Sequence, residues 1–305
     1  MEIKASTLTI GQHTLTWGSR TYIMGILNIT PDSFSGDGLL ASVKDNDFKQ
    51  VVLEQARRFV DSGADILDVG GESTRPGSQP VSLDLEMERV IPVIKTLSTA
   101  LDVLISIDTY KSQVAEAALE AGAQIVNDVW GLRADAHLAE VAARKQAPVI
   151  LMHNRSSWVH AEIKERLGGR YIGMAYENLL EDVKKELLES VTLARTAGIP
   201  DDHIIVDPGI GFGKTVEQNL ELVDRLGEIR ALGYPVLLGP SRKSFIGYTL
   251  NLPADQRLEG TAAAVAIGIV RGADIVRVHD VEYMVRVARM SDALTRHFPN
   301  PARTH

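Results

Sequence analysis

The chain has 305 residues, 45% of them hydrophobic, a formal net charge of −8 and no cysteine. This length and apolar content suffice for a large buried core, and the negative charge without a Lys/Arg-rich run argues against nucleic-acid binding. The missing cysteines exclude disulfides, thiolate metal sites and a cysteine nucleophile, and they fit a cytoplasmic protein.

The N-terminal segment predicts a small β-hairpin. Residues 3–18 alternate apolar and polar side chains around a Gly-Gln pair. No apolar signal segment is visible there, and no run of about 18 apolar residues occurs in the chain, so we expect no membrane association. We interpret 1–305 as one domain, with the hairpin inside 1–20 and a tail at about 297–305.

Eight short runs rich in β-branched residues follow, separated by longer stretches with helical spacing. The candidate strands are 22–27, 65–69, 103–107, 124–127, 148–152, 204–207, 235–239 and 273–278. Strands that alternate with helices form parallel sheets, because each crossover needs a helix. Eight units favour an α/β fold of the (β/α)8 TIM-barrel type, with the hairpin covering its N-terminal end. An open doubly wound sheet is the alternative.

A polar or charged residue stands at the carboxyl end of every candidate strand. These residues are Asn28, Asp68, Asp108, Asn127, Asp128, His153, Asp207, Lys243, Arg277 and His279. In a parallel barrel these ends meet at one mouth, where active sites lie. Any single Asp or Asn among them has an alternative role as a helix N-cap, but lysine, arginine and histidine are poor N-caps.

The loop after the first strand reads "ILNITPDSFSGDG". Asn28 offers a neutral oxygen that can ligate Mg²⁺ without adding charge repulsion beside a phosphate. Phe34 is an aromatic side chain that can fold over a flat ligand. The alternative is an ordinary loop in which Phe34 is anchored in the core.

The loop after the second strand reads "DVGGESTRPGS", from Asp68 to Ser78. Its paired glycines allow a tight turn and a close approach to a ligand. Thr74 and Arg75 supply donors suited to an anionic group, and Pro76 stiffens the far side of the loop. The alternative is a surface loop with a solvated arginine.

Two motifs near the C-terminal half are rich in glycine or cations. "DPGIGFGKT" (207–215) fails the Walker pattern at Pro208 and fails the dinucleotide spacing, so we expect its glycines to keep side chains away from the mouth. "GPSRKSFIG" (239–247) places two cations beside two hydroxyls, which suits an anionic leaving group. A solvated basic turn is the alternative for this second motif.

Asp108, Asn127, Asp207 and Lys243 together predict a flat ligand. Two carboxylates and a carboxamide on the floor of a barrel complement a heterocycle with amino and lactam edges. Lys243 and Arg277 can meet ring carbonyl or phosphate oxygens. The alternative is that Asp108 and Asp207 are structural acids paired with arginine.

Two other segments stand out. The polar stretch 154–170 after the fifth strand is interpreted as an insertion that can move. The last helical stretches, with "AAAVAIGIV" and "VEYMVRVARM", carry more apolar surface than a barrel exterior needs, which predicts a homodimer.

Seven motifs in order make the chain resemble dihydropteroate synthase, a family of pterin-binding enzymes of folate biosynthesis. They are "MGILNITPDSFSGDG", "DVGGESTRPGS", "ISIDTYKSQVAEAALEAGAQIVNDVWG", "VILMH", "IIVDPGIGFGKT", "PVLLGPSRKSFIG" and "ADIVRVHDV". The resemblance as a whole spans about residues 22–295. The resemblance implies two small-molecule substrates. The enzyme would join (7,8-dihydropterin-6-yl)methyl diphosphate to 4-aminobenzoate, releasing diphosphate and forming 7,8-dihydropteroate.

The resemblance also implies a role for each candidate site residue. Asn28 would bind Mg²⁺ with the diphosphate, and the pterin ring would be held by Asp108, Asn127, Asp207 and Lys243. Arg277 and His279 would bind the diphosphate. The 4-aminobenzoate site, where sulfonamides compete in this family, would be shaped by Phe34, Thr74, Arg75, Pro76, Phe212 and Ser244.

The implied mechanism is dissociative. The C–O bond breaks first, a pterin cation forms and the arylamine attacks it, with Asp108, Lys243, Arg277 and His279 as the catalytic residues. One departure from the family concerns the first loop, which reads "SFSGDG" where "SFSDGG" is expected, so that its carboxylate, Asp37, is displaced by one position.

Two alternative functions stay open from the sequence. A methyltetrahydrofolate-dependent methyltransferase shares a pterin-binding barrel, but it has no diphosphate to eject, and the motifs "GGESTRPG" and "SRKSF" argue against it. A non-catalytic pterin-binding paralogue is disfavoured because Asn28, Arg75, Lys243 and His279 are all present.

Overall fold

The structure is a computed structural model, and it describes residues 6–30, 45–73, 80–157, 160–164, 166–172 and 175–296. The predicted tail at about 297–305 lies outside these ranges. So do Phe34 and Asp37 of the first loop, and Thr74, Arg75 and Pro76 of the second.

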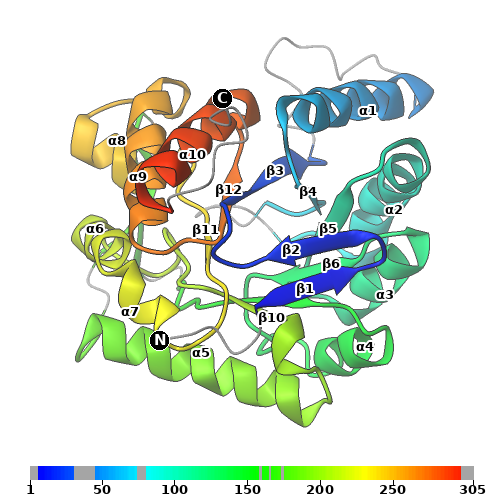
Figure 1. Cartoon of the computed structure of the whole chain (residues 1–305), viewed down its shortest axis with the longest axis horizontal. Coiled ribbons are helices and arrows are strands. Elements are labelled where there is room, and N and C mark those ends of the chain that lie inside the picture. Colours follow the sequence, from blue (N-terminus) through cyan, green and yellow to red (C-terminus); the bar gives the residue numbers. More distant parts are fainter. Residues whose placement is uncertain are drawn as a thin grey trace, which may run out of the picture.

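Eight parallel strands form the central sheet (Figure 1). They are β3 (Tyr22–Asn28), β4 (Ile66–Gly70), β5 (Leu104–Asp108), β6 (Ile125–Asp128), β7 (Val149–Met152), β10 (Ile204–Asp207), β11 (Leu237–Leu238) and β12 (Ile275–Val278). Their order is β10-β7-β6-β5-β4-β3-β12-β11. A parallel bridge between Val206 and Val236 joins the first and last of these strands, so the sheet closes into a barrel. The predicted (β/α)8 barrel is confirmed, and the open sheet is wrong.

Helices surround the barrel between successive strands. They are α1 (Asp45–Ser62), α2 (Leu83–Ala100), α3 (Ser112–Ala121), α4 (Leu138–Arg144), α5 (Leu179–Thr196), α6 (Val216–Asp224), α7 (Leu226–Arg230), α8 (Ser244–Leu250), α9 (Leu258–Val270) and α10 (Val281–Thr295). Local sequence sets several helix starts: the Ser82 side chain caps α2, and Thr215 and Gln218 form a capping box on α6. Within the described ranges, none of the helices combines the length and apolar character needed to cross a membrane.

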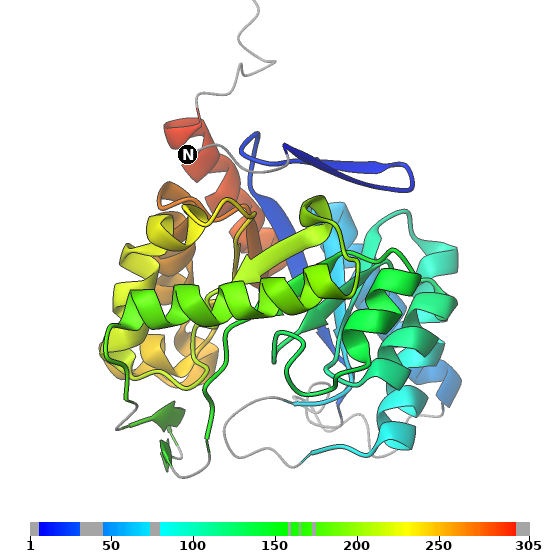
Figure 2. The ribbon, with the colours of Figure 1, turned by 90° about the horizontal axis from the view of Figure 1, so that it is seen from below.

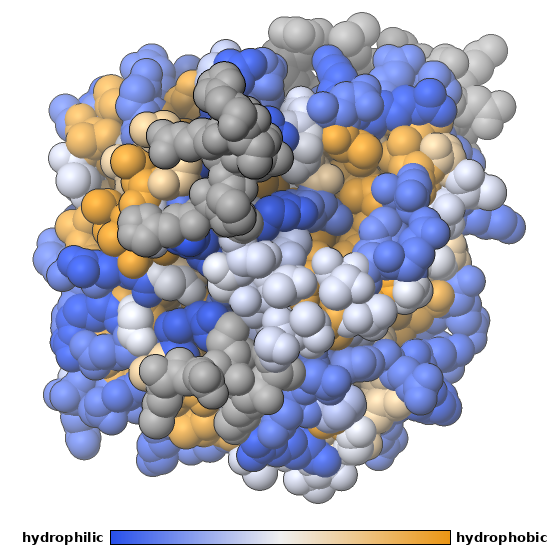
Figure 3. Space-filling view, in the orientation of Figure 1, coloured by the Kyte–Doolittle hydropathy of each residue, from blue (hydrophilic) through white to orange (hydrophobic). Residues whose placement is uncertain are grey.

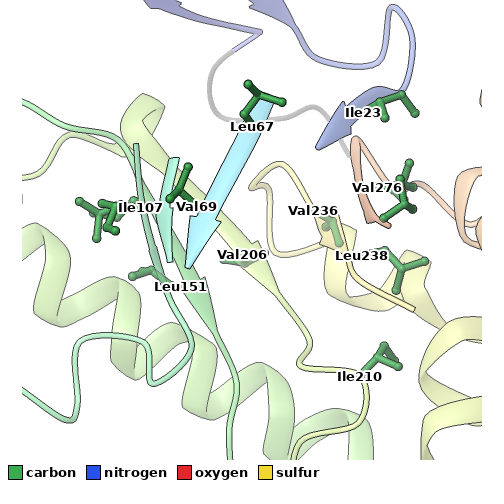
Figure 4. Close-up of a cluster of buried hydrophobic side chains, with 14 of the residues drawn as sticks. Ile23, Leu67, Val69, Ile107, Leu151, Val206, Ile210, Val236, Leu238 and Val276 are labelled. Carbon is green, nitrogen blue, oxygen red and sulfur yellow. The ribbon is translucent and has the colours of Figure 1, made fainter. Parts of the chain in front are cut away.

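The helices pack on the outward-facing side chains of the strands. Leu67 and Val69 of β4 are fully buried in this layer, together with Ile107 of β5 and Val206 of β10 (Figure 4). Successive side chains of a strand point to opposite faces, so the residues between them point into the barrel. The outer core therefore fixes which residues reach the interior.

The N-terminal hairpin seals one end of the barrel (Figure 2). It consists of β1 (Thr7–Ile10) and β2 (His13–Thr16), which pair antiparallel. Its Leu8, Leu15 and Trp17 are nearly fully buried. They belong to one apolar cluster with inward-facing side chains of every barrel strand: Tyr22, Met24, Ile66, Leu104, Ile125, Ile150, Ile205, Leu237 and Ile275. The prediction that the hairpin covers the N-terminal end is confirmed.

Shortening a buried side chain of the N-terminal hairpin tests how much the hairpin contributes to stability. Leu8→Ala is expected to lower the free energy of unfolding by about 2–3 kcal/mol, because Leu8 is 2% exposed and its loss leaves a cavity at the barrel end. Urea denaturation measures the change. Thr9→Ala is the control on the exposed side of the same strand, with an expected change within about 0.5 kcal/mol. Equal effects of the two substitutions would contradict the view that the hairpin stabilises the barrel by burying Leu8.

The described part of segment 154–170, together with Tyr171, contains a second hairpin that the sequence did not predict. Its strands are β8 (Ala161–Lys164) and β9 (Gly168–Tyr171), drawn in green at the lower left of Figure 2. The Tyr248 hydroxyl donates to Gly168 O at 3.2 Å, and Arg257 Nη2 donates to Leu167 O at 3.0 Å. These contacts dock the hairpin on α8, at the end of the barrel opposite the N-terminal hairpin.

Candidate active site

Polar side chains fill the barrel above its apolar floor. Each lies two residues beyond a floor residue on the same strand, so it faces the interior one layer higher. They are Asp68 on β4, Ser106 on β5, Asn127 on β6, Asp207 on β10 and Arg277 on β12. Of these, Asp68 and Ser106 are fully buried, and Asn127 and Asp207 are 4% and 6% exposed. Of the residues predicted to meet at one mouth, Asp68, Asn127, Asp207 and Arg277 lie in this layer.

Arg277 is the centre of the layer. Its Nε donates to Asp68 Oδ2 at 2.5 Å, and its Nη2 donates to Asp108 Oδ2 at 2.7 Å. Asn127 Nδ2 also donates to Asp68 Oδ2, at 3.1 Å. Four side chains from four strands are thus joined in one network. Within the described part of the chain, Asp68 Oδ1 and Ser106 Oγ are buried without a hydrogen-bond partner.

Within this network, the ionisation of Asp108 changes near neutral pH. Burial raises the pKa of Asp108 to about 7, although the Arg277 guanidinium opposes the shift. Burial alone would lower the pKa of Arg277, but the carboxylates of Asp68 and Asp108 raise it, so the guanidinium stays charged. A ligand that donates N–H groups would therefore favour the ionised form of Asp108.

The loop after β10 brings Asp207 and Phe212 to the mouth. Asp207 Oδ1 accepts a hydrogen bond from the Gly209 N–H at 2.7 Å. Gly209 and Gly213 have φ of 71° and 63°, and a Cβ on them would overlap the carbonyl groups of His153 and Arg155. The glycines of this motif thus serve close packing against the segment after β7.

Lys243 reaches the same loop from the other side. Its Nζ donates to Ile210 O and lies 4.6 Å from the centre of the Phe212 ring. Burial lowers the pKa of Lys243 to about 8, against the opposing effect of Asp207. A positively charged lysine here can donate to a ligand oxygen, and it would lose its charge more easily than a surface lysine.

The backbone before Lys243 is held in an unusual conformation. Arg242 has φ of 57°, a value that non-glycine residues seldom adopt. Its guanidinium forms a two-bond pair with Asp280, at 2.9 and 2.5 Å, and its N–H donates to Thr261 Oγ1 at 3.1 Å. Strained backbone that is fixed by several contacts is common where a functional side chain must be aimed.

The remaining described candidates lie around this centre. Ser244 is half-buried at the first turn of α8. The His279 N–H donates to Ser241 Oγ at 3.2 Å, and the Ser241 hydroxyl lies 3.0 Å from His279 Nδ1. Asn28 is half-buried at the end of β3, paired with Gly70. Among the residues the structure describes, no three His, Asp or Glu side chains gather as a metal-binding group.

The alternative roles weighed for the acids can now be decided. Asp108, Asn127 and Asp207 are not N-caps, since Lys111, His137 and Thr215 are the residues that precede α3, α4 and α6. Asp108 is paired with an arginine, as the structural alternative required, but the pair faces the mouth. Asp128 has a structural role, because it is fully buried and accepts from the N–H groups of the turn after β6.

The sequence did not point to Ser106, and two further residues of this region were given no role. Asp68 was noticed at the end of its strand but given no role, although it pairs with Arg277. Lys214 was read only as part of a failed phosphate loop, yet it is 1% exposed beneath that loop. A signal existed for Asp68, because it stands two residues after a floor isoleucine, in phase with Arg277 and Asp207.

Comparisons with known proteins agree with this geometry. Residues 24–279 match the family of pterin-binding enzymes. The chain is 49% identical over 290 residues to dihydropteroate synthase of Clostridium beijerinckii, covering 95% of this chain and 100% of the relative. A Clostridium difficile dihydropteroate synthase structure, obtained in the presence of pteroic acid, is 48% identical with a TM-score of 0.82, covering 92% and 98% of the two chains. A Xanthomonas albilineans dihydropteroate synthase structure with 4-aminobenzoic acid is 35% identical with a TM-score of 0.83, covering 95% and 98%.

Proposed function

The chain belongs to the dihydropteroate synthases, a group of pterin-binding enzymes, and we propose that the polar mouth of its barrel is where the two substrates are joined. It is a transferase of a pterinylmethyl group that forms 7,8-dihydropteroate in folate biosynthesis. The observation that carries the assignment to the mouth is the network of Arg277 with Asp68, Asp108 and Asn127, one strand layer above the apolar floor.

Pterin recognition follows from the chemistry of the layer. Asp207 as a carboxylate would accept two N–H bonds from the amino-pyrimidinone edge of the ring. Asn127 can donate and accept at once, and Lys243 would donate to the ring carbonyl. Asp108 would complete the ring site and lie close to the positive charge that forms during the reaction.

The proposed reaction is dissociative. The bond between the exocyclic CH₂ and the diphosphate oxygen breaks, and its electron pair leaves with the diphosphate. The electron-rich pterin stabilises the resulting cation, and the Asp108 carboxylate adds electrostatic stabilisation. The nitrogen of 4-aminobenzoate then forms the new C–N bond and releases one proton. Arg277 and His279 would bind the departing diphosphate.

The 4-aminobenzoate site is proposed beside Phe212 and Ser244, on the loops after β10 and β11. Both residues are within the described chain, and the Phe212 ring already packs against Lys243. Thr74, Arg75, Pro76 and Phe34 would complete this site, on the resemblance to the family. Excluding water from it matters, because water would trap the pterin cation as an alcohol.

Mg²⁺ fits the residues at the end of β3. Asn28 is half-buried there and supplies a neutral carboxamide oxygen, a ligand type that Mg²⁺ accepts. Mg²⁺ in phosphate sites commonly takes one or two protein ligands and completes its shell with substrate oxygens and water. When bound, the ion would neutralise charge on the departing diphosphate. We therefore propose that Asn28 holds Mg²⁺ together with the substrate.

Removal of the metal gives a direct test. Chelation is expected to abolish diphosphate release, and Asn28→Ala is expected to raise the Mg²⁺ concentration needed for half-maximal rate by about tenfold or more. A coupled diphosphate assay measures both. Gln50→Ala, an exposed amide on α1, is the control and should change neither quantity. An unchanged Mg²⁺ requirement in Asn28→Ala would remove Asn28 from the metal site.

The proposed function as a whole is tested by what diphosphate release requires. The synthase should release diphosphate only when 4-aminobenzoate and Mg²⁺ are both present, with 7,8-dihydropteroate formed in equal amount. Pterin binding without release would support the non-catalytic alternative. Methyl transfer from methyltetrahydrofolate would support the methyltransferase.

A homodimer is proposed through α9 and α10. These neighbouring helices expose large apolar side chains: Ile267 (48%), Val270 (54%), Tyr283 (52%), Met290 (60%) and Leu294 (65%). Figure 3 shows apolar surface on the side where Figure 1 places α8 and α9. Light scattering should give a dimer for the native chain and a monomer for Met290→Glu. Leu188→Glu on α5 is the control, because Leu188 is also exposed (41%) but lies away from these helices. A cytoplasmic location remains a prediction from sequence.

A further inference from the structure

Lys214 is a fully buried cation that the proposed reaction does not use. It follows the glycine-rich loop after β10 and is 1% exposed. Its Nζ lies 2.9 Å from His153 Nδ1 and donates to Gly209 O and Phe212 O, both at 3.0 Å. A buried ammonium is costly unless each of its N–H groups has an acceptor, and here three acceptors surround one nitrogen.

The protonation of His153 fixes the charge of Lys214. His153 Nε2 lies 3.2 Å from Glu186 Oε2, a contact that lacks the geometry of a hydrogen bond. The negative charge of Glu186 still favours a proton on Nε2, which leaves Nδ1 as an acceptor for Lys214. Glu186 stays ionised, because burial is outweighed by His153 and Arg155, which hold the pKa of its carboxyl well below its usual range. Burial lowers the pKa of His153 to about 3, so the ring remains neutral. With Nδ1 as a third acceptor beside the two carbonyl oxygens, the geometry around Lys214 suits an ammonium that donates three hydrogen bonds. Burial lowers the pKa of Lys214 well below its ordinary value, and the Asp207 carboxylate opposes that shift.

The carbonyl groups held by Lys214 belong to the loop after β10, which lines the mouth. Gly209, whose carbonyl it fixes, also donates its N–H to Asp207 at 2.7 Å. Phe212, the other residue it fixes, lies under the Lys243 ammonium. Lys243 itself donates to Ile210 O, within the same loop. Lys214 Nζ thus holds the loop whose backbone positions Asp207, Phe212 and Lys243.

We propose that Lys214 is a positioning residue for the pterin: it touches no substrate, but it fixes the loop after β10 and keeps Asp207 in the carboxylate form that the pterin edge requires. This inference rests on the proposed function, in which Asp207 binds the ring. It assigns the motif "GFGK" a role different from that of a phosphate loop, since the lysine points inward to backbone carbonyls.

The charges around Asp207 support the second half of the proposal. Asp207 is buried, which raises its pKa, while Lys243, the Gly209 N–H, Lys214 and Arg277 oppose that shift. Of the three cations, Lys243 lies on the loop after β11, Lys214 on the loop after β10 and Arg277 on strand β12. Removing Lys214 would take away one of them and leave burial less opposed, so the pKa of Asp207 would rise further.

The test compares Lys214→Met with Lys184→Met, which removes a partly exposed lysine of α5. Calorimetric binding of pteroic acid is measured between about pH 5.5 and 7.5. Lys214→Met is expected to bind at least about tenfold more weakly, and its deficit should grow as the pH falls, because protonated Asp207 cannot accept two N–H bonds. Lys184→Met should follow the native curve. Equal affinity, or a deficit that is the same at every pH, would overturn the proposal.

A third variant separates this proposal from the proposed function. Asp207→Asn should weaken pteroic acid binding at all pH values, and adding Lys214→Met to it should cause no further loss that grows as the pH falls. If Asp207→Asn binds like the native chain, the ring site itself is misassigned. If Asp207→Asn loses affinity but Lys214→Met does not, only the role of Lys214 is wrong.

The absence of cysteine in the sequence allows a chemical rescue that also covers a folding failure of Lys214→Met. Lys214→Cys is alkylated while unfolded, with bromoethylamine to restore an ammonium or with iodoacetamide to give a neutral amide, and is then refolded beside native protein. The ammonium form is expected to recover pteroic acid affinity to within about threefold of native, and the amide form to stay weak. Equal affinity of the two forms would show that the charge is not needed.

Discussion

Arg277→Met is expected to abolish diphosphate release and to lower the free energy of unfolding by about 3–5 kcal/mol. The loss of stability follows from Asp68, which is fully buried and would be left without its counter-ion. The loss of activity follows because Arg277 is the cation at the centre of the mouth and is proposed to bind diphosphate. Urea denaturation and the diphosphate assay measure the two effects separately.

A second substitution separates the two effects of Arg277. In Asp68→Asn/Arg277→Met the buried charge is gone, so most of the lost stability should return, while diphosphate release stays absent. Arg286→Met is the control, because its pair with Glu282 is largely exposed and should contribute less than about 1 kcal/mol. If the double variant is as unstable as Arg277→Met alone, the instability does not come from the unpaired Asp68 carboxylate.

The barrel and its mouth could be predicted because both follow from local patterns. Strands such as β4 and β5 are short β-branched runs, and the polar residue at each strand end stands in phase with the apolar floor. Even β11, with two residues in regular strand geometry, falls inside its predicted range of 235–239. Chain order and right-handed crossovers then leave few arrangements for eight such units.

The partners within the mouth could not be predicted, because pairing depends on register around the closed barrel. Arg277 and Asp68 are 209 residues apart in the chain, and no local pattern says which of several acids the arginine meets. Lys214 was missed for a related reason. Its acceptors are backbone carbonyls of a loop whose shape depends on the positive φ of Gly209 and Gly213.

The hairpin β8–β9 was missed because its sequence lacks the usual strand signal. Its four-residue strands are polar, and no residue of β8 is fully buried. The stability of the hairpin comes from tertiary contacts instead. Arg257, 3% exposed, joins its turn to the Arg242 and Leu252 carbonyl groups, far away in sequence. Contacts of this kind leave no periodic trace in the sequence.

Lys243→Met is expected to separate activity from stability in the opposite direction to Arg277→Met. The charged lysine lies partly buried beside Asp207, and burial lowers its pKa to about 8 from an ordinary value of 10.5. Keeping this ammonium in the folded state therefore costs free energy at neutral pH. Methionine should make the fold about 1–2 kcal/mol more stable at pH 7, while kcat/KM falls by about a hundredfold or more because the donor to the ring carbonyl is lost.

The pH dependence of this difference gives the sharpest check. Below about pH 8 the lysine is charged in both the folded and unfolded states. The native chain therefore carries the full free-energy cost of burying the ammonium. Between about pH 8 and 10.5 the folded state has released a proton that the unfolded state still holds, so native stability rises relative to Lys243→Met. The advantage of the variant should shrink over that range in urea denaturation, and Lys184→Met should show no such trend. If Lys243→Met is less stable than the native chain at pH 7, the ammonium of Lys243 stabilises the fold. If it is more stable and inactive, the lysine is kept at a cost that only substrate binding explains.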